Sequence, residues 1–359
     1  DFYTRLAEVT DYWDFSYSSV SFEPRYFYDE THFRECVGDM ALARMFGDES
    51  VYIPEDFGAY VTADNVAEHV AQMAQAEPLP LEEYTAQVPV LMYHHISEDV
   101  ATDMVISPAR FEAHMAALKE HGWNSVTIRQ LIEFGEQGTP LPDHPVLITF
   151  DDGYTSNLEL AAPILERHGL NAVIFVIGIN AGQSVYAHSG QPLDPPRFAL
   201  KDVRPYLESG VLEVESHTFD LHQRADYGYS GREGVLPLAG EPEDAYRQVL
   251  AGDCRQARQL FAQELGQQVT ALAYPFGLVS QEADRIFGEE GIKVTVTSVF
   301  GPNQIRGGDP ASLRMLNRYA ITDNTSTQEL LDLVNWHKET FLGKRSCAIW
   351  GWSPEFSRR

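Results

Sequence analysis

After residue 88 the chain alternates between short apolar runs and longer segments in which apolar residues recur at helical spacing. The runs are rich in Val, Ile, Leu and Phe, which is typical of strands buried on both faces. They predict strands over residues 88–93, 146–150, 172–177, 211–214, 269–273 and 293–299. The segments between them predict helices over residues 107–122, 158–167, 201–208, 243–265 and 328–341.

Capping residues support these helices. Ser107 is a typical N-cap, Pro108 suits the first helical position, and Gly122 and Gly169 are typical helix stops. Repeated strand–helix units predict an α/β fold with a mostly parallel sheet, either open or closed into a barrel. In both forms the functional side chains lie beyond the carboxyl ends of the strands.

The chain before residue 88 has a different composition. It is rich in aromatic residues, and the Pro-containing stretch Ala76–Leu81 reads as a linker. The tract Tyr28–Phe33 resembles the final Asp-x-x-His block of the SGNH esterases, although the serine block of such an enzyme is missing. Thr31 as a helix N-cap, with His32 in the first turn, is an equally good interpretation.

Charge excludes some classes of partner. The 359 residues include 26 Lys and Arg against 53 Asp and Glu, a net charge of −27. This argues against nucleic acid and anionic lipid surfaces, which need basic patches. A cationic partner would suit the chain better, while acidity that serves solubility alone is the simpler interpretation.

The cysteines and the apolar runs exclude further classes of protein. The three cysteines are far apart and form neither a disulfide framework nor a thiolate metal site. No apolar run is long enough to span a membrane. The chain opens with Asp1 rather than Met, which is the pattern left when an export signal or anchor is removed. We therefore expect an extracytoplasmic protein, secreted or anchored at the cell surface.

Two carboxylates, Asp151 and Asp152, follow the strand predicted over residues 146–150. Successive strand side chains point to opposite faces, so both can serve one site only if the backbone leaves strand geometry, which Gly153 permits. One Asp here could be a helix N-cap. Two in succession favour a functional site.

Two histidines follow the strand predicted over residues 211–214. His217 and His222 can converge if the chain turns between them, and neutral imidazole is a common ligand of transition metals. A carboxylate from another strand end would complete a set of three ligands. Three protein ligands leave one coordination position open, as a catalytic zinc requires. Such an ion acidifies bound water and polarises a carbonyl.

A third strand end carries the turn Tyr274-Pro275-Phe276-Gly277. A turn of this kind can expose a backbone N–H to a developing oxyanion. On its own it is only a turn.

Together, Thr-Phe-Asp-Asp-Gly, the two histidines and the Tyr-Pro-Phe-Gly turn resemble the polysaccharide deacetylases of carbohydrate esterase family four, from about residue 88 to residue 341. The five-residue histidine spacing is similar to the branch that deacetylates poly-β-1,6-N-acetylglucosamine. The resemblance implies a distorted (β/α)7 barrel with a small N-terminal accessory segment. It divides the chain into an accessory segment (1–76), a linker (77–87), a deacetylase domain (88–345) and a C-terminal tail (346–359).

The resemblance also implies roles for single residues. Asp151 matches the general base, and the Phe276 N–H matches an oxyanion donor. The metal ligands that it implies are Asp152, His217 and His222, for a divalent ion that is best taken as Zn²⁺. The turn residues that it places against substrate are Tyr274, Pro275 and Gly277. His94 and His95 follow a strand similar to the first barrel strand of the same branch, where roles in the core or beside the site are equally open.

Two positions depart from the family pattern. Ala273 stands where many members have an Arg that orients the base, and Arg318 stands where many have the histidine that acts as general acid. Arginine cannot donate a proton at neutral pH. The water on the metal, or Asp151 after accepting a proton, could protonate the leaving amine instead.

The sequence thus predicts a metal-dependent enzyme that removes N-acetyl groups from an N-acetylglucosamine polymer, either a cell-wall or a matrix glycan. An esterase for O-acetylated sugars is a second hypothesis, because the same metal and base would serve. A carbohydrate-binding protein with a weakened site is a third, motivated by Ala273 and Arg318. Nothing in the sequence predicts an oligomeric state.

Overall fold

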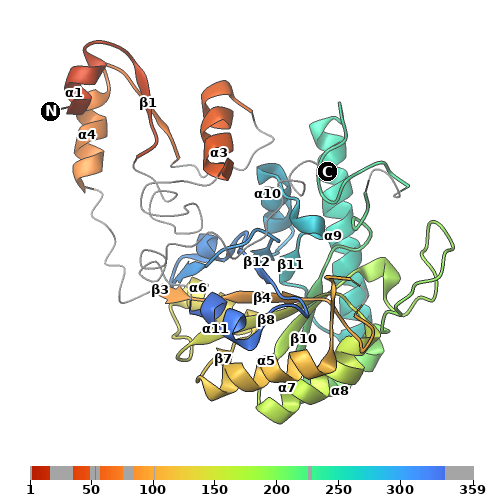
Figure 1. The fold of residues 1–359 in the computed structure, drawn as a ribbon. Helices are drawn as coiled ribbons and strands as arrows, with labels where there is room; N and C mark the ends of the chain where they lie inside the picture. The colour runs from red at the N-terminus through yellow and green to blue at the C-terminus, as the bar shows by residue number, and fades with distance from the viewer. Residues whose placement is uncertain are drawn as a thin grey trace.

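A computed structural model describes residues 2–16, 35–48, 53, 57–75, 85–100, 102–224 and 229–335. Most of them form an α/β barrel with seven parallel strands, in the spatial order β12-β11-β10-β9-β8-β4-β14 (Figure 1). The strands are β4 (Val90–Tyr93), β8 (Pro145–Asp152), β9 (Ala172–Val176), β10 (Leu212–Ser216), β11 (Ala271–Ala273), β12 (Val294–Val296) and β14 (Tyr319–Ala320).

The two outer strands of this order meet through Leu316, just before β14. Its N–H donates to the Thr295 carbonyl at 2.8 Å, and its own carbonyl accepts from the Thr297 N–H at 2.8 Å. These bonds close the ring with a single bridge, so that the barrel is distorted on this side. The expected distorted (β/α)7 barrel is confirmed.

Helices cover the outside of the barrel. They are α5 (Pro108–Glu120), α6 (Ile128–Gln137), α7 (Ala162–His168), α8 (Arg204–Ser209), α9 (Glu243–Leu265), α10 (Gln281–Glu289) and α11 (Thr327–Val334). In Figure 1, α5, α7 and α8 lie along one side of the barrel, and α9 lies along another. Ser107 caps α5 as its sequence predicts, and a Thr127–Gln130 capping box begins α6.

Successive side chains of each strand point to opposite faces, so that the buried residues form two core clusters. On β8, Ile148 and Phe150 pack outward in the cluster that includes helix residues such as Phe111 of α5, whereas Leu147 packs in the second cluster. Asp151 has the same parity as Leu147 and therefore faces the barrel interior. The strand pattern thus carries one carboxylate inward at the end of β8.

Short elements complete the domain. They are β3 (Thr85–Gln87), β5 (His95–Ile96), β6 (Val105–Ile106), β7 (Asn124–Ser125), β13 (Gln304–Arg306), a π-helix η2 (Asn157–Ala161), and the 3₁₀ turns η3 (Gly178–Asn180), η4 (Leu200–Val203), η5 (Pro275–Gly277) and η6 (Pro310–Leu313). The end of the predicted linker, residues 85–87, pairs with β13 as an antiparallel strand. The rest of that linker lies outside the described residues, as do the Tyr28–Phe33 block and the predicted tail from residue 346.

The N-terminal elements lie apart from the barrel at the upper left of Figure 1. They are α1 (Phe2–Ala7), β1 (Tyr12–Asp14), α3 (Glu35–Phe46), β2 (Ala59–Val61) and α4 (Val66–Gln75), with β1 and β2 paired antiparallel. His69 of α4 bonds to Asp14 of β1 at 2.8 Å. Gln281 of α10 donates to the Ile53 carbonyl at 3.2 Å and links this segment to the barrel.

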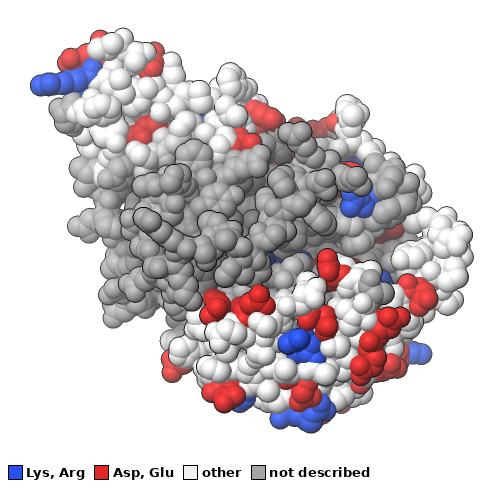
Figure 2. Space-filling view, viewed as in Figure 1, with Lys and Arg blue, Asp and Glu red and all other residues white. Residues whose placement is uncertain are grey.

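The surface carries the acidity of the composition. Figure 2 shows acidic side chains spread over the lower part of the visible face, with smaller basic groups between them. Among the described helices, none is both long and apolar enough to cross a membrane.

Candidate metal centre and active site

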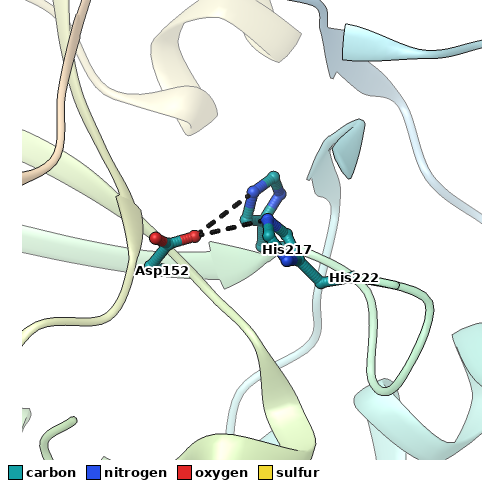
Figure 3. A group of neighbouring side chains, drawn as sticks. All are labelled: Asp152, His217 and His222. Carbon is teal, nitrogen blue, oxygen red and sulfur yellow. Dashed lines mark ion pairs between the residues drawn. The ribbon is translucent and has the colours of Figure 1, made fainter. Parts of the chain in front are cut away.

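The three predicted metal ligands converge at the carboxyl ends of two barrel strands. Asp152 is the last residue of β8, His217 follows β10, and His222 lies on the loop after it. Asp152 Oδ1 is 3.7 Å from His217 Nε2 and 3.6 Å from His222 Nε2 (Figure 3). All three ligand atoms lie within 4.8 Å of one another.

This geometry fits a divalent ion. Two ligand atoms on one tetrahedral zinc, each about 2.0–2.1 Å from it, are about 3.4 Å apart, close to the separations observed. The Nδ1 of His217 lies 2.8 Å from the Ala273 carbonyl, which can only accept, so that this nitrogen carries the proton. His217 Nε2 is then left with a lone pair, as a metal ligand requires.

Burial and neighbouring charges keep the ligands in the protonation states that bind a cation. Burial would raise the pKa of Asp152, but the neighbouring His222, His94, His217 and Arg197 outweigh burial, so that its pKa lies well below the ordinary range. Burial lowers the pKa of His222 to about 4, although the carboxylates oppose this shift. At neutral pH the site therefore presents one carboxylate and a neutral His222, the forms that bind metals.

Asp151 is held by an arginine from the other side of the barrel. Arg318 donates from Nη1 to Asp151 Oδ1 and from Nη2 to Oδ2, at 2.7 Å each. Its Nε donates to the Thr297 carbonyl at 2.6 Å, and the side chain is 1% exposed. Burial would raise the pKa of Asp151, but chiefly the positive charge of Arg318 lowers it. Arg318 thus holds the carboxylate, a role that the methyl side chain of Ala273 cannot fill.

Backbone strain gathers at the same place. Asp152, Thr218 and Phe276 have φ values of 74°, 68° and 59°, in the left-handed region that non-glycine residues rarely adopt. Each lies at the end of a different barrel strand, on β8, after β10 and after β11. The departure from strand geometry expected at Gly153 therefore begins one residue earlier, at Asp152, which turns its carboxylate toward the histidines.

The turn after β11 brings Phe276 beside the ligands. The Phe276 ring packs against the His222 ring, with 4.4 Å between their centroids. Gly277 has φ 69°, and a Cβ there would lie 1.9 Å from the Ser298 hydroxyl.

The Tyr274 hydroxyl points away from the site and donates to buried Asp284 at 2.6 Å, and Pro275 is buried as well. Among the predicted turn residues, the structure therefore brings Phe276 to the ligands and places the Tyr274 side chain in the core.

The two histidines after β4 have different surroundings. His94 Nε2 lies 3.9 Å from Asp151 Oδ2, at the edge of the site. His95 Nδ1 lies 2.8 Å from the Ser156 hydroxyl, and its ring packs against Tyr154. Burial lowers the pKa of His94, although Asp151 and Asp152 oppose this effect. The structure thus separates two adjacent imidazoles that the sequence leaves equivalent.

Arg197 was not singled out from the sequence. Its guanidinium lies 3.6 Å from the centre of the Tyr154 ring, and Nη2 lies 3.8 Å from Asp152 Oδ2. Oδ1 of the same carboxylate faces the two histidines. Arg197 therefore places a positive charge beside the Asp152 oxygen that does not face the histidines. A lone Arg in a loop between β9 and α8 carries no sequence pattern that would reveal this contact.

Comparison with known proteins finds polysaccharide deacetylases. Residues 138–295 match the family model described as polysaccharide deacetylase. YxkH of Bacillus subtilis, assigned as a polysaccharide deacetylase, is 29% identical over 216 residues, which cover 60% of this chain and 66% of that protein. The poly-β-1,6-N-acetyl-D-glucosamine N-deacetylase of Staphylococcus aureus is 23% identical over 202 residues, 56% of this chain and 64% of its own. The chain spans just under two thirds of the length of these relatives.

Solved structures share the fold. A de-N-acetylase from Aggregatibacter actinomycetemcomitans superimposes with a TM-score of 0.60 at 22% identity, over 69% of this chain and 100% of that one. IcaB from Ammonifex degensii gives a TM-score of 0.56 at 23% identity, over 69% of this chain and 97% of that one. At these identities the likeness concerns the barrel.

Proposed function

We propose that this chain, whose residues 138–295 match the polysaccharide deacetylase family model, is a metal-dependent hydrolase of N-acetyl groups on an N-acetylglucosamine polymer. The observation that carries the proposal is the convergence of three ligand atoms beside a carboxylate that Arg318 keeps charged and aimed. The S. aureus relative, named for poly-β-1,6-N-acetyl-D-glucosamine, supports this choice of substrate. Such a glycan lies outside the cytoplasm, and we place the protein there.

Asp152, His217 and His222 are the residues that would hold the ion. A bound divalent cation, for which zinc is the best match to this ligand set, would polarise the acetyl carbonyl and acidify a water molecule. The protein contributes the deprotonated ligands, the Ala273 carbonyl that fixes the His217 tautomer, and Arg197, whose positive charge lies beside the Asp152 oxygen that does not face the histidines.

Asp151 acts as general base in this proposal. It lies next to Asp152 but is not one of the three ligands, so it can take the proton of the attacking water. Arg318 binds one lone pair of each carboxylate oxygen and leaves the others free to accept that proton. The Phe276 N–H, oriented by its left-handed backbone, would donate to the oxyanion that develops on the acetyl oxygen.

A proton must then reach the leaving amine. Arg318 keeps its charge at all accessible pH values and cannot supply it. Asp151 can return the proton that it accepted. His94 is a second donor, because its Nε2 lies 3.9 Å from Asp151 Oδ2 and can exchange a proton with it through a small movement. His94→Gln separates the two routes, since a large loss of kcat with unchanged metal content would assign the donor to His94.

Acetate release decides between this function and its alternatives. We expect release from a β-1,6-linked N-acetylglucosamine oligomer, and its loss in Asp151→Asn. Faster release from an O-acetylated oligomer would favour an esterase. Binding of the glycan without acetate release, in protein that carries its metal, would favour a carbohydrate-binding protein.

A further inference from the structure

Two long loops leave the carboxyl ends of neighbouring strands. The segment 177–203 follows β9, and the segment 217–242 follows β10, and these strands pair in parallel over five residues on each side. Both loops therefore rise beside the metal ligands. Figure 1 shows the loop after β9 projecting outward at the right of the barrel. Within these two loops, the predicted site residues lie only where the second one begins.

One side-chain contact joins the two loops. His188 on the first loop places Nε2 at 2.9 Å and 2.8 Å from the two carboxylate oxygens of Asp220 on the second. The Tyr229 hydroxyl donates to Asp220 Oδ2 at 3.3 Å. The His188 and Tyr229 rings lie against each other, with 3.8 Å between centroids and 31° between planes. Asp220 thus fixes the two rings in one orientation.

The stacked pair is unusually open for aromatic residues. Tyr229 is 65% exposed, and Tyr186, two residues before His188, is 42% exposed. Large exposed aromatic side chains that are nevertheless held in place by a buried or half-buried partner are typical of binding surfaces. No packing role requires Tyr229 here, because most of its ring faces solvent.

The loop that holds the two rings in place also carries a metal ligand. Asp220 lies two residues before the ligand His222, and the backbone N–H groups of Phe219 and Asp220 donate to buried Asp253 of α9 at 2.8 Å and 2.7 Å. The loop that carries a ligand is therefore the loop that carries the anchor of the rings. Tyr229 therefore lies on the same loop as a ligand, where a polymer whose reacting sugar sits at the metal centre can contact it.

We propose that Tyr229, stacked on His188, binds a sugar ring of the glycan that flanks the residue being deacetylated. The axial C–H groups of a pyranose present an apolar face that packs on an aromatic ring, while its hydroxyl groups remain in water. This inference rests on the proposed function, because it takes the occupant to be the same polymer.

The test compares chain lengths in binding, not in turnover. Equilibrium affinities are measured by calorimetry for β-1,6-linked N-acetylglucosamine disaccharide and pentasaccharide, with zinc-loaded full chains that all carry Asp151→Asn so that the ligands are not consumed. Tyr229→Ala should weaken pentasaccharide binding roughly threefold to tenfold, the size of one aromatic contact, and leave the disaccharide unchanged. Tyr229→Phe keeps the ring and should bind both ligands like the Asp151→Asn parent.

Tyr60 offers a matched control. It is 50% exposed, packs on an aromatic neighbour, Trp13, and donates to a carboxylate, Asp11, but it lies in the N-terminal segment. Tyr60→Ala should leave both affinities unchanged. Equal pentasaccharide affinity in Tyr229→Ala and the Asp151→Asn parent would overturn the inference. If that parent binds the pentasaccharide more tightly than the disaccharide but the wild type releases no acetate, the proposed function fails while the binding surface stands.

Discussion

Arg318 and Asp151 form a two-point contact across the barrel, with two N–O distances of 2.7 Å between groups that are almost fully buried. The pair joins the end of β8 to the residue before β14, so that the orientation of the base depends on a residue far from it in the sequence. A two-point contact fixes both the position and the plane of the carboxylate, which a single charge cannot do.

Arg318→Lys should therefore lower kcat while leaving the metal content unchanged. Lysine keeps the charge but offers one point of contact, and a misplaced catalytic group can cost roughly 10²-fold. Because the pKa of Asp151 is lowered chiefly by Arg318, Arg318→Met should move the acidic limb of the pH–kcat profile to higher pH. Profiles of equal shape and midpoint in Arg318→Met and the wild type would contradict this role. Thermal unfolding checks that each variant is folded, since breaking a buried pair costs about 3–5 kcal/mol.

Metal analysis tests the ligand set. The purified chain should bind about one divalent ion, and His217→Ala combined with His222→Ala should abolish that binding. His95→Ala is the matched control, because His95 lies nearby but bonds to Ser156. Full occupancy in the double variant would show that the ion is held elsewhere, and loss of metal in His95→Ala would show that the site is more diffuse than the structure indicates.

Substitutions of the adjacent Asp151 and Asp152 should have different effects on catalysis and on metal binding. Asp151→Asn should keep the metal and lose about 10²–10⁴-fold in kcat, as expected for a general base. Asp152→Asn should weaken metal affinity measured by competition with a chelator, because an amide is a poorer ligand than a carboxylate. The mechanism is wrong if Asp151→Asn turns over at a rate near that of the wild type.

Gly277 should resist substitution more than an ordinary left-handed glycine. Gly277→Ala places a Cβ 1.9 Å from the Ser298 hydroxyl, so that the turn carrying Phe276 must move. Gly210→Ala is the control, because Gly210 has φ 76° with nothing within 4 Å of its added Cβ. That control should cost about 1–2 kcal/mol in the free energy of unfolding. Gly277→Ala should cost more and should also reduce kcat, while equal costs in both variants would exclude a steric clash.

His114 should contribute to acid sensitivity. Burial lowers its pKa to about 4 in the folded protein, from 6.5 when unfolded, and its Nε2 lies 2.9 Å from the Thr325 carbonyl. The unfolded chain therefore binds a proton between these values while the folded chain does not. The contribution is fully present above pH 6.5 and is lost as the pH falls through 4, for a total of about 3 kcal/mol.

His114→Gln should accordingly flatten the fall of unfolding free energy between pH 6.5 and 4, measured by urea titration. His121→Gln removes an exposed imidazole from the end of the same helix, and it controls for loss of a histidine as such. The assignment is refuted if both variants and the wild type lose stability in parallel over this range.

The periodicity of the sequence predicted most of the barrel. The strands observed as β8, β9 and β10 match apolar runs, and α9 matches its predicted bounds of residues 243–265. Apolar runs were sufficient because every one of these strands is buried on both faces. Helices α6 and α10 were missed, although Thr127–Gln130 of α6 forms a capping box that the sequence displays. The last predicted helix begins at Thr327, one residue before its predicted start, and ends at Val334, before its predicted end at residue 341.

The site was predictable where it depends on local sequence. Asp152, His217 and His222 were found because strand ends and spacing reveal them, and the structure brings them together. The sequence marks Arg318 only as a departure from the family pattern and does not predict its contact with Asp151. The two residues are 167 positions apart, and a contact over that separation produces no periodic pattern in the sequence. The Tyr274 side chain was expected against substrate, but a buried hydrogen bond to Asp284 takes it into the core.

The order of strands in the barrel has a consequence for anyone who trims this gene. A fragment cut to the family match, residues 138–295, would keep the three ligands and the turn. It would lose β4, which pairs with β8, and β14, which pairs with β4. The hydrogen-bonding edge of β8 would then face water as an apolar, unpaired template for aggregation, and the base would lose both Arg318 and His94. An expression fragment should therefore begin before residue 85 and extend beyond residue 334, so that the closing strands and α11 are retained.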